Sequence, residues 1–201
     1  MHNIKKALRY ANKQGLTARS KNWYTEANLF AQELSTKYRI SLDKICGIIA
    51  GLSPAISWEQ NKKDAEILAL LYDLNLHNEA HEHHRFSTYA RNVLKCIDIL
   101  NADREVIQAF SNKNCGFKTR YFYLNILKPT EQTGVTIDRH AVAIAEGKNN
   151  SHKQGLTPKQ YNNYADQYIK IARENNLLAH ELQAITWVAY KHAKDNGTEI
   201  Y

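Results

Sequence analysis

The sequence has few of the residues that interrupt regular structure or cross-link a chain. Its 201 residues include only 3 prolines, 8 glycines and 3 cysteines. So little glycine and proline excludes collagen-like and low-complexity chains, and a hydrophobic fraction of 43% is typical of a globular protein. A chain of this length buries about 70% of the surface of its unfolded state. We therefore expect residues 1–201 to form a single compact unit that needs no disulfide or metal for stability.

Long hydrophobic runs are also absent. No stretch approaches the roughly 20 apolar residues of a membrane-spanning helix, and Met1 to Lys6 lack the apolar segment of a secretory signal. We expect a cytoplasmic protein with no membrane partner. The cysteines, Cys46, Cys96 and Cys115, are odd in number and form no Cys-x-x-Cys pair. This pattern indicates reduced thiols rather than a disulfide framework, a zinc site or an iron-sulfur site.

The charge of the chain is biased toward positive. Lys and Arg number 27 against 20 Asp and Glu, which gives a net charge of +7. A small protein with this excess accumulates near polyanions, so nucleic acid is the first partner to consider. A basic protein that binds no nucleic acid is an equally good interpretation of charge alone. The motifs have to decide between the two.

Apolar residues recur at intervals of three and four along nearly the whole chain, and no alternating strand pattern competes with them. The sequence therefore predicts an all-α fold. The expected helices cover residues 3–14, 25–38, 42–50, 57–76, 87–100, 104–110, 117–127, 138–146, 157–175 and 178–194.

The segment from His77 to Arg85 is interpreted as a polar break and as the boundary between two lobes. It contains four histidines, His77, His81, His83 and His84. A metal site is one interpretation of this cluster, but no supporting ligand pattern is found elsewhere in the chain. We expect a solvated polar loop.

Two short motifs stand at the starts of successive expected helices. In Gly116-Phe-Lys-Thr119, the glycine permits a tight turn, and the amides freed at a helix start can hold a phosphate oxygen. In Thr136-Ile-Asp-Arg-His140, the aspartate has the position of a helix N-cap. An ordinary turn and an ordinary cap are the alternative interpretations. The distinctive feature is that Lys118 and Asp138 open consecutive helices 20 residues apart.

With their surroundings, these motifs resemble the helix-hairpin-helix superfamily of base-excision DNA glycosylases. Its endonuclease III branch carries a hairpin that ends in Gly-x-Lys-Thr and is followed by Val-Asp-x-His. Gly116-Phe-Lys-Thr119 and Ile137-Asp-Arg-His140 match these positions. Upstream, Gly51-Leu-Ser-Pro-Ala-Ile-Ser-Trp58 is similar to the family's early Leu-Ser segment. The resemblance runs from roughly residue 45 to residue 147.

The resemblance implies a two-lobed helical DNA-glycosylase-like fold with a helix-hairpin-helix motif. The hairpin-bearing lobe is expected at about residues 42–147, and the other lobe is expected to combine the N-terminal and C-terminal helices. It also implies a DNA glycosylase or abasic-site lyase of base-excision DNA repair. In this role Lys118 attacks the sugar C1′ and nicks the strand by β-elimination, while Asp138 assists the attack and steadies positive charge.

The expected partner is double-stranded DNA with a damaged, modified or abasic nucleotide. We expect the protein to act as a monomer without a cofactor or a metal. By the same resemblance, the residues expected to contact DNA are Lys113, Asn114, Gly116, Thr119, Arg120, Arg139 and His140. Four cations flank the matched motifs and would form a phosphate-contacting rim, with a merely solvated face as the alternative: Lys113, Arg120, Arg139 and Lys148. We expect Trp187 to pack in the core.

The chain departs from the family pattern at three points. Asn114 stands where the hairpin usually has its first glycine, Ala55 stands where a wedge glutamine often follows Leu-Ser, and no cluster cysteines follow the last helix. The iron-sulfur branch is therefore excluded. Two alternatives stay open. The protein is either an enzyme of narrower activity, which nicks abasic sites left by another glycosylase or acts on an unusual modified base, or a DNA-binding module that has lost catalysis.

Overall fold

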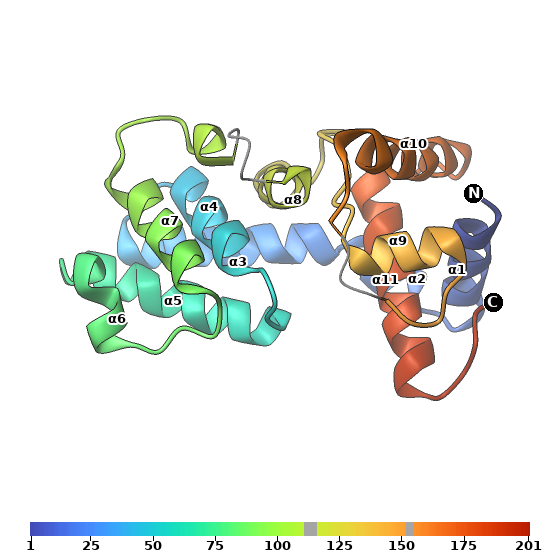
Figure 1. The fold of residues 1–201 in the computed structure, drawn as a ribbon, viewed down its shortest axis with the longest axis horizontal. Helices are drawn as coiled ribbons and strands as arrows, with labels where there is room; N and C mark the ends of the chain where they lie inside the picture. Colours follow the sequence, from blue (N-terminus) through green and yellow to red (C-terminus); the bar gives the residue numbers. More distant parts are fainter. Residues whose placement is uncertain (111–115, 152–154) are drawn as a thin grey trace. The chain divides into compact units, whose positions relative to one another are not determined.

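The computed structural model describes residues 1–110, 116–151 and 155–201. All regular structure in these ranges is helical, which confirms the predicted all-α fold (Figure 1). The α-helices are α1 (His2–Lys13), α2 (Thr17–Lys21), α3 (Trp23–Tyr38), α4 (Leu42–Leu52), α5 (Trp58–Asp73), α6 (Ala80–His83), α7 (Ala90–Asn101), α8 (Phe117–Leu127), α9 (Arg139–Glu146), α10 (Pro158–Glu174) and α11 (Ala179–Asp195). Two 3-10 helices are η1 (His77–Glu79) and η2 (Val106–Phe110).

The chain divides into two compact units. Unit 1 consists of Met1–Glu26 and Lys128–Tyr201, and unit 2 consists of Ala27–Leu127. The expected hairpin-bearing lobe, at about residues 42–147, differs from unit 2 at both ends, because most of α3 joins unit 2 and α9 joins unit 1. The buried run Ala141–Ala145 packs α9 against α1 and α11, which explains the second difference. The glycosylase-like arrangement and the helix-hairpin-helix motif stay predictions.

The centre of unit 2 is α4, whose residues from Ile45 to Leu52 are all buried. Around it pack α5, α7, α8 and η2. Two glycines let neighbouring elements approach closely. A Cβ atom on Gly47 would lie 2.5 Å from Cγ1 of Val106 in η2, and one on Gly51 would lie 2.5 Å from Sγ of Cys96 in α7. Real Cβ atoms keep larger distances, so α4 needs glycine at both positions.

The segment that we interpreted as a polar loop and a lobe boundary is helical and lies within unit 2. It contains η1 and α6, and His77 is buried. Nε2 of His84 lies 3.2 Å from Oδ1 of the fully buried Asp64, whose Oδ2 accepts a hydrogen bond from the Ser87 amide at 3.0 Å. The loop interpretation was wrong because these partners are distant in sequence. Within the described ranges, no group of three or more His, Cys, Asp or Glu side chains could hold a metal ion.

Unit 1 is built on α11, against which α1, α2, α9 and α10 pack. A capping box opens α10. Thr157 Oγ1 accepts a hydrogen bond from the Gln160 amide at 3.3 Å, and Gln160 Oε1 accepts one from the Thr157 amide at 2.9 Å. Among the helices of the described ranges, none has the length and apolar character needed to cross a bilayer.

Candidate functional site

Lys118 lies in the first turn of α8 in unit 2. The helix begins at Phe117, directly after the exposed Gly116, whose carbonyl oxygen accepts a hydrogen bond from the Thr119 amide at 3.2 Å. Lys118 is partly exposed and forms no ion pair with a carboxylate of the described residues. The positive end of the helix dipole disfavours a cation in this turn. Helix stability therefore does not explain why a lysine stands here.

Buried contacts fix α8 within unit 2. The hydroxyl of Tyr123 donates a hydrogen bond to Oδ1 of Asp43 in the first turn of α4. Burial, followed by this bond, raises the pKa of Tyr123 above its ordinary value, so the phenol stays protonated and remains the donor. Near the end of the helix, Nδ2 of Asn28 donates to the carbonyl of Ile126 at 2.8 Å. The helix that carries Lys118 is therefore held firmly by its own unit.

Asp138 is the N-cap residue of α9 in unit 1. Its Oδ1 accepts a hydrogen bond from the Ala141 amide at 2.8 Å, and its backbone is extended, with φ −100° and ψ 179°. This is the cap that the sequence offered as the alternative to catalysis. Within the described ranges Oδ2 has no hydrogen-bond partner, so the carboxylate keeps one oxygen for another charge. Capping and electrostatic catalysis are therefore compatible at this residue.

A buried hydroxyl of α10 holds the residues that precede Asp138. The hydroxyl of Tyr161 donates a hydrogen bond to the carbonyl of Val135 at 2.8 Å and accepts one from the Ile137 amide at 3.1 Å. All three residues are buried. The position at which α9 begins is thus set by packing against α10.

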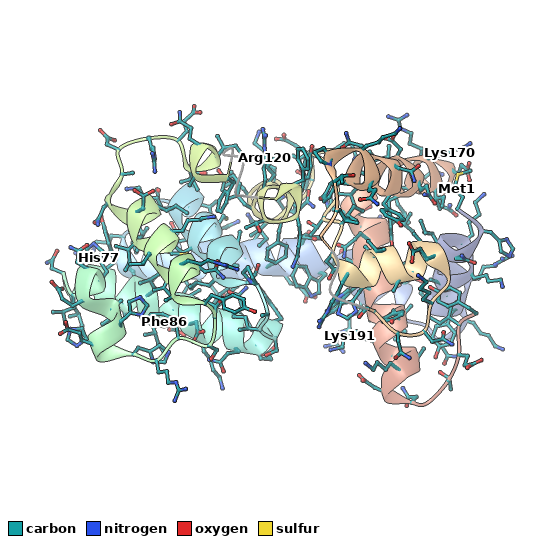
Figure 2. The ribbon with its side chains drawn as sticks, viewed as in Figure 1. Met1, His77, Phe86, Arg120, Lys170 and Lys191 are labelled. Atoms are coloured by element: carbon teal, nitrogen blue, oxygen red, sulfur yellow. The ribbon has the colours of Figure 1, made fainter. Side chains whose placement is uncertain are left out.

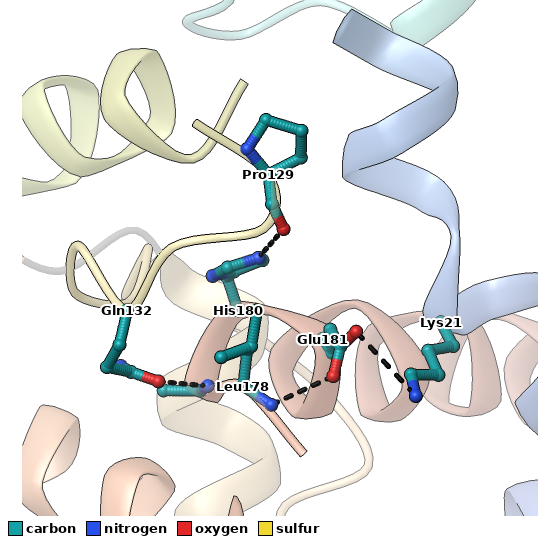
Figure 3. A network of polar contacts seen from close by, with 7 residues as sticks. Lys21, Pro129, Gln132, Leu178, His180 and Glu181 are labelled. Carbon is teal, nitrogen blue, oxygen red and sulfur yellow. Dashed lines mark hydrogen bonds and ion pairs between the residues drawn. The ribbon is translucent and has the colours of Figure 1, made fainter. Parts of the chain in front are cut away.

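The loop between α8 and α9 begins near Pro129, and contacts with the start of α11 hold it there (Figure 3). Nε2 of the buried His180 donates a hydrogen bond to the carbonyl of Pro129 at 2.8 Å. Burial lowers the pKa of His180 below its ordinary 6.5, so the ring is held in its neutral form. Next to it, Oε2 of Glu181 accepts from the Leu178 amide at 2.8 Å, and Oε1 lies 3.8 Å from Nζ of Lys21.

His140 of α9 packs against aromatic side chains of α11. Its ring lies edge-on to that of Trp187, with 6.5 Å between centroids, and 5.6 Å from that of Tyr190. Nζ of Lys191 stands 5.5 Å from the centroid of the partly buried Trp187 ring, within the range of a cation–π interaction. Imidazole, indole and ammonium groups therefore meet on one side of unit 1.

Burial is the main reason why the pKa of His140 lies below its ordinary 6.5. Asp138 opposes this effect, whereas the positive charges of Arg139, Lys191 and Lys194 add to it. The three cations are exposed and form no ion pair with the carboxylates of the described ranges. The imidazole of His140 thus lies among cations that have no counterion in the part of the chain that the structure describes.

Sequence reasoning chose one flanking cation that is already paired and missed two others. Lys148, expected beside the motifs, lies 2.6 Å from Glu146. Lys191 and Lys194 belong to no motif, and Trp187 was assigned to the core. The available signal was their spacing, since positions 187, 191 and 194 follow the i, i+4, i+7 pattern of one helix face.

The predicted residues fall into two groups, one in each unit. The group in unit 2 comprises Gly116, Lys118, Thr119 and Arg120. The group in unit 1 comprises Asp138, Arg139 and His140. Arg120 on α8 is labelled in Figure 2, and its Nε is buried without a hydrogen-bond partner among the described residues. Lys113 and Asn114 lie outside the described residues.

One family model matches the chain, over residues 1–194, and its description is a family of unknown function, DUF7178. No curated protein and no solved structure matches the chain. A functional proposal therefore has to be argued from the chemistry of the chain's own residues.

Proposed function

The chain belongs to DUF7178, a family of unknown function, and we propose that it is a DNA glycosylase and abasic-site lyase. One observation carries the proposal. Two helix starts match helix-hairpin-helix glycosylase motifs. Among the residues that the structure describes, the amine of Lys118 has no ion pair and the carboxylate of Asp138 has one oxygen without a hydrogen-bond partner. The substrate is double-stranded DNA with a damaged, modified or abasic nucleotide. The protein acts on it in the cytoplasm as a monomer and without a cofactor.

The chemistry begins at the amine of Lys118, which has to lose a proton before it can attack. On an intact nucleotide, Nζ attacks C1′, the bond from C1′ to the base breaks, and the base leaves with the electron pair and takes up a proton. Opening of the sugar ring at the bond from C1′ to O4′ then gives a Schiff base. On an abasic sugar, the amine adds to the C1′ aldehyde and water leaves, which gives the same Schiff base.

Asp138 acts on the charge that develops in these steps. Positive charge grows at the sugar as the base leaves and persists in the protonated Schiff base, and a fixed carboxylate oxygen stabilises it. Loss of a proton from C2′ then breaks the bond from C3′ to O3′, and the strand leaves with its phosphate. Hydrolysis of the remaining imine returns the lysine.

Borohydride trapping tests the proposal, because borohydride reduces a Schiff base to a stable amine. Wild-type protein is expected to form a covalent adduct with an abasic duplex, and Lys118→Ala is expected to form none. Lys63→Ala, which removes an exposed lysine of α5 in the same unit, is the matched control and should keep the full yield. Binding of the duplex without any wild-type adduct would overturn the enzyme and leave a DNA-binding module.

A specific observation favours the narrower activity, nicking of abasic sites made by another glycosylase. Ala55 stands where a wedge glutamine is expected and is exposed, with a φ of 71°. Its methyl group is too small to fill the gap that an extruded base leaves in a duplex. Parallel assays on uracil-containing and pre-formed abasic duplexes decide between the two activities. Cleavage of the abasic duplex alone identifies the nicking enzyme.

A further inference from the structure

We propose that one surface of unit 1, formed by the start of α9 and the second half of α11, binds the phosphodiester backbone of DNA. We call it the α9–α11 face, and it consists of Arg139, His140, Trp187, Lys191 and Lys194. The choice of DNA as partner rests on the proposed function. The α11 residues are new to the site, because neither the motifs nor the family resemblance points to them.

The geometry of α11 places its three residues together. Trp187, Lys191 and Lys194 follow one another at intervals of four and three, so they share one face of the helix. With a rise of about 1.5 Å per residue, the two lysines start about 4.5 Å apart along the axis. Lys191, labelled in Figure 2, is exposed, and its ammonium group stands over the indole. The cation–π contact with Trp187 therefore favours one position of the Lys191 ammonium group.

The electrostatics of the face favour an anion. The charged and titratable groups that act on or pack against His140 are Asp138 and Arg139 from α9 and Tyr190, Lys191 and Lys194 from α11. Elsewhere in unit 1, Lys5, Lys21 and Lys148 are each neutralised by a glutamate. The cations of the face instead repel one another, and they add to the effect of burial, which is the main reason why the pKa of His140 is low. A bound phosphate would relieve this repulsion.

A nucleic-acid backbone fits these groups better than a single small anion. Lysine and arginine are the side chains that contact phosphate oxygens without reading bases. Several cations spread over two helices offer more than one phosphate contact, whereas one free phosphate would use only part of them. The partly exposed Trp187 next to these cations adds a surface for a sugar or an unpaired base. The face thus holds the strand rather than selecting its sequence.

Equilibrium binding of a labelled duplex with an uncleavable abasic analogue tests the proposal. Lys191→Ala/Lys194→Ala is compared with Lys159→Ala/Lys170→Ala, which removes two exposed lysines of α10 in the same unit. The double substitution in α11 should weaken DNA binding by about tenfold or more. It should also reduce the slope of log K, the association constant, against log salt concentration by about 2. Equal losses from the two pairs would overturn a defined face, and tighter binding of RNA than of the duplex would overturn DNA as the partner.

The ring of His140 gives a second readout that does not depend on the variants. Adding the duplex should raise the pKa of His140, followed by NMR of its ring protons, because a phosphate offsets the neighbouring cations. Inorganic phosphate at the same phosphate concentration should produce a much smaller rise. An unchanged pKa with the duplex bound would overturn the proposal, and an equal rise with inorganic phosphate would make the ligand a free anion instead of a strand.

The outcomes separate this inference from the proposed chemistry. The borohydride adduct of the wild-type protein tests the lyase, whereas the affinity of Lys191→Ala/Lys194→Ala for DNA tests the face. Weakened binding without any wild-type adduct would support the face and overturn the lyase. If Lys191→Ala/Lys194→Ala binds DNA as tightly as the wild type and the wild type forms the adduct, the proposed face is overturned and the lyase is not.

Discussion

The hydroxyl of Tyr161 accepts a hydrogen bond from the amide of Ile137, the residue that precedes Asp138, at 3.1 Å. Because the same hydroxyl also donates to the carbonyl of Val135, one phenol satisfies two buried backbone groups. The Tyr161 side chain thus supplies the backbone of residues 135–137 with the hydrogen bonds that a neighbouring β-strand would otherwise provide. The orientation of the Asp138 carboxylate depends on it.

Tyr161→Phe should destabilise the protein by about 1–3 kcal/mol, because it leaves a buried amide and a buried carbonyl without partners. Urea unfolding measures the loss. Tyr164→Phe, on the same helix, removes a hydroxyl that bonds the exposed Glu146 and should cost much less. Similar losses in the two variants would show that the Tyr161 hydroxyl has no special part in holding the loop.

Asp138→Asn should separate charge from capping. Asparagine caps a helix as well as aspartate does, so the free energy of unfolding should change little, while Asp138→Ala should cost about 1 kcal/mol. Turnover of Asp138→Asn should nevertheless fall by about 100-fold or more, with DNA affinity unchanged or higher, because only the stabilising charge is lost. Single-turnover kinetics and binding assays measure the two effects. Equal losses in both would make Asp138 a cap and nothing more.

Lys118→Gln should stabilise the protein while it abolishes trapping. The variant removes a cation from the first turn of α8, where the helix dipole disfavours it, and should gain about 0.3–1 kcal/mol at low salt. The gain should shrink as salt screens the charge. Lys63→Gln, in the middle of α5, should show no such gain. A destabilised Lys118→Gln would instead indicate that this lysine supports the structure of unit 2.

Stability should decrease in mildly acidic solution because of His180. Burial lowers its pKa in the folded state below the 6.5 of an exposed histidine, so the unfolded chain binds the proton more readily. The stability that the neutral His180 contributes is complete above about pH 6.5 and is lost as the pH falls from there toward the pKa of His180 in the folded state. Urea unfolding between about pH 5 and pH 8 measures it. His180→Gln keeps an amide donor for Pro129 and should flatten the curve, and parallel curves would contradict this origin.

The long helices could be predicted because apolar residues recur in them at intervals of three and four. The helix expected over residues 117–127 is α8, with the same limits. The five-residue α2 was missed because it is too short to show a period, and α6 was missed because its surroundings, not its own residues, hold it. His84 needs Asp64, 20 positions earlier in the chain, and no local pattern reveals that pairing.

The candidate site shows the same division. Motifs placed Lys118 and Asp138 at helix starts, and the structure has them there. Trp187 was assigned to the core because aromatic residues at helical spacing usually pack inside. Its cation–π partner and the charges around His140 follow from how α9 and α11 pack, which becomes visible only in three dimensions. The joint catalytic role of Lys118 and Asp138 stays a prediction.

The two glycines of α4 have a consequence for how unit 2 can vary. A Cβ atom at Gly47 would meet Val106 of η2 and Ile99 of α7, whereas one at Gly51 would meet Cys96 of α7, so a shift of α7 alone could not accommodate methyl groups at both positions. In a saturation library, selection for folded protein should return glycine at both sites even where the adjoining isoleucines accept valine or leucine. A Gly-x-x-x-Gly pair in this helix is therefore a hallmark by which other chains with the same packing can be recognised.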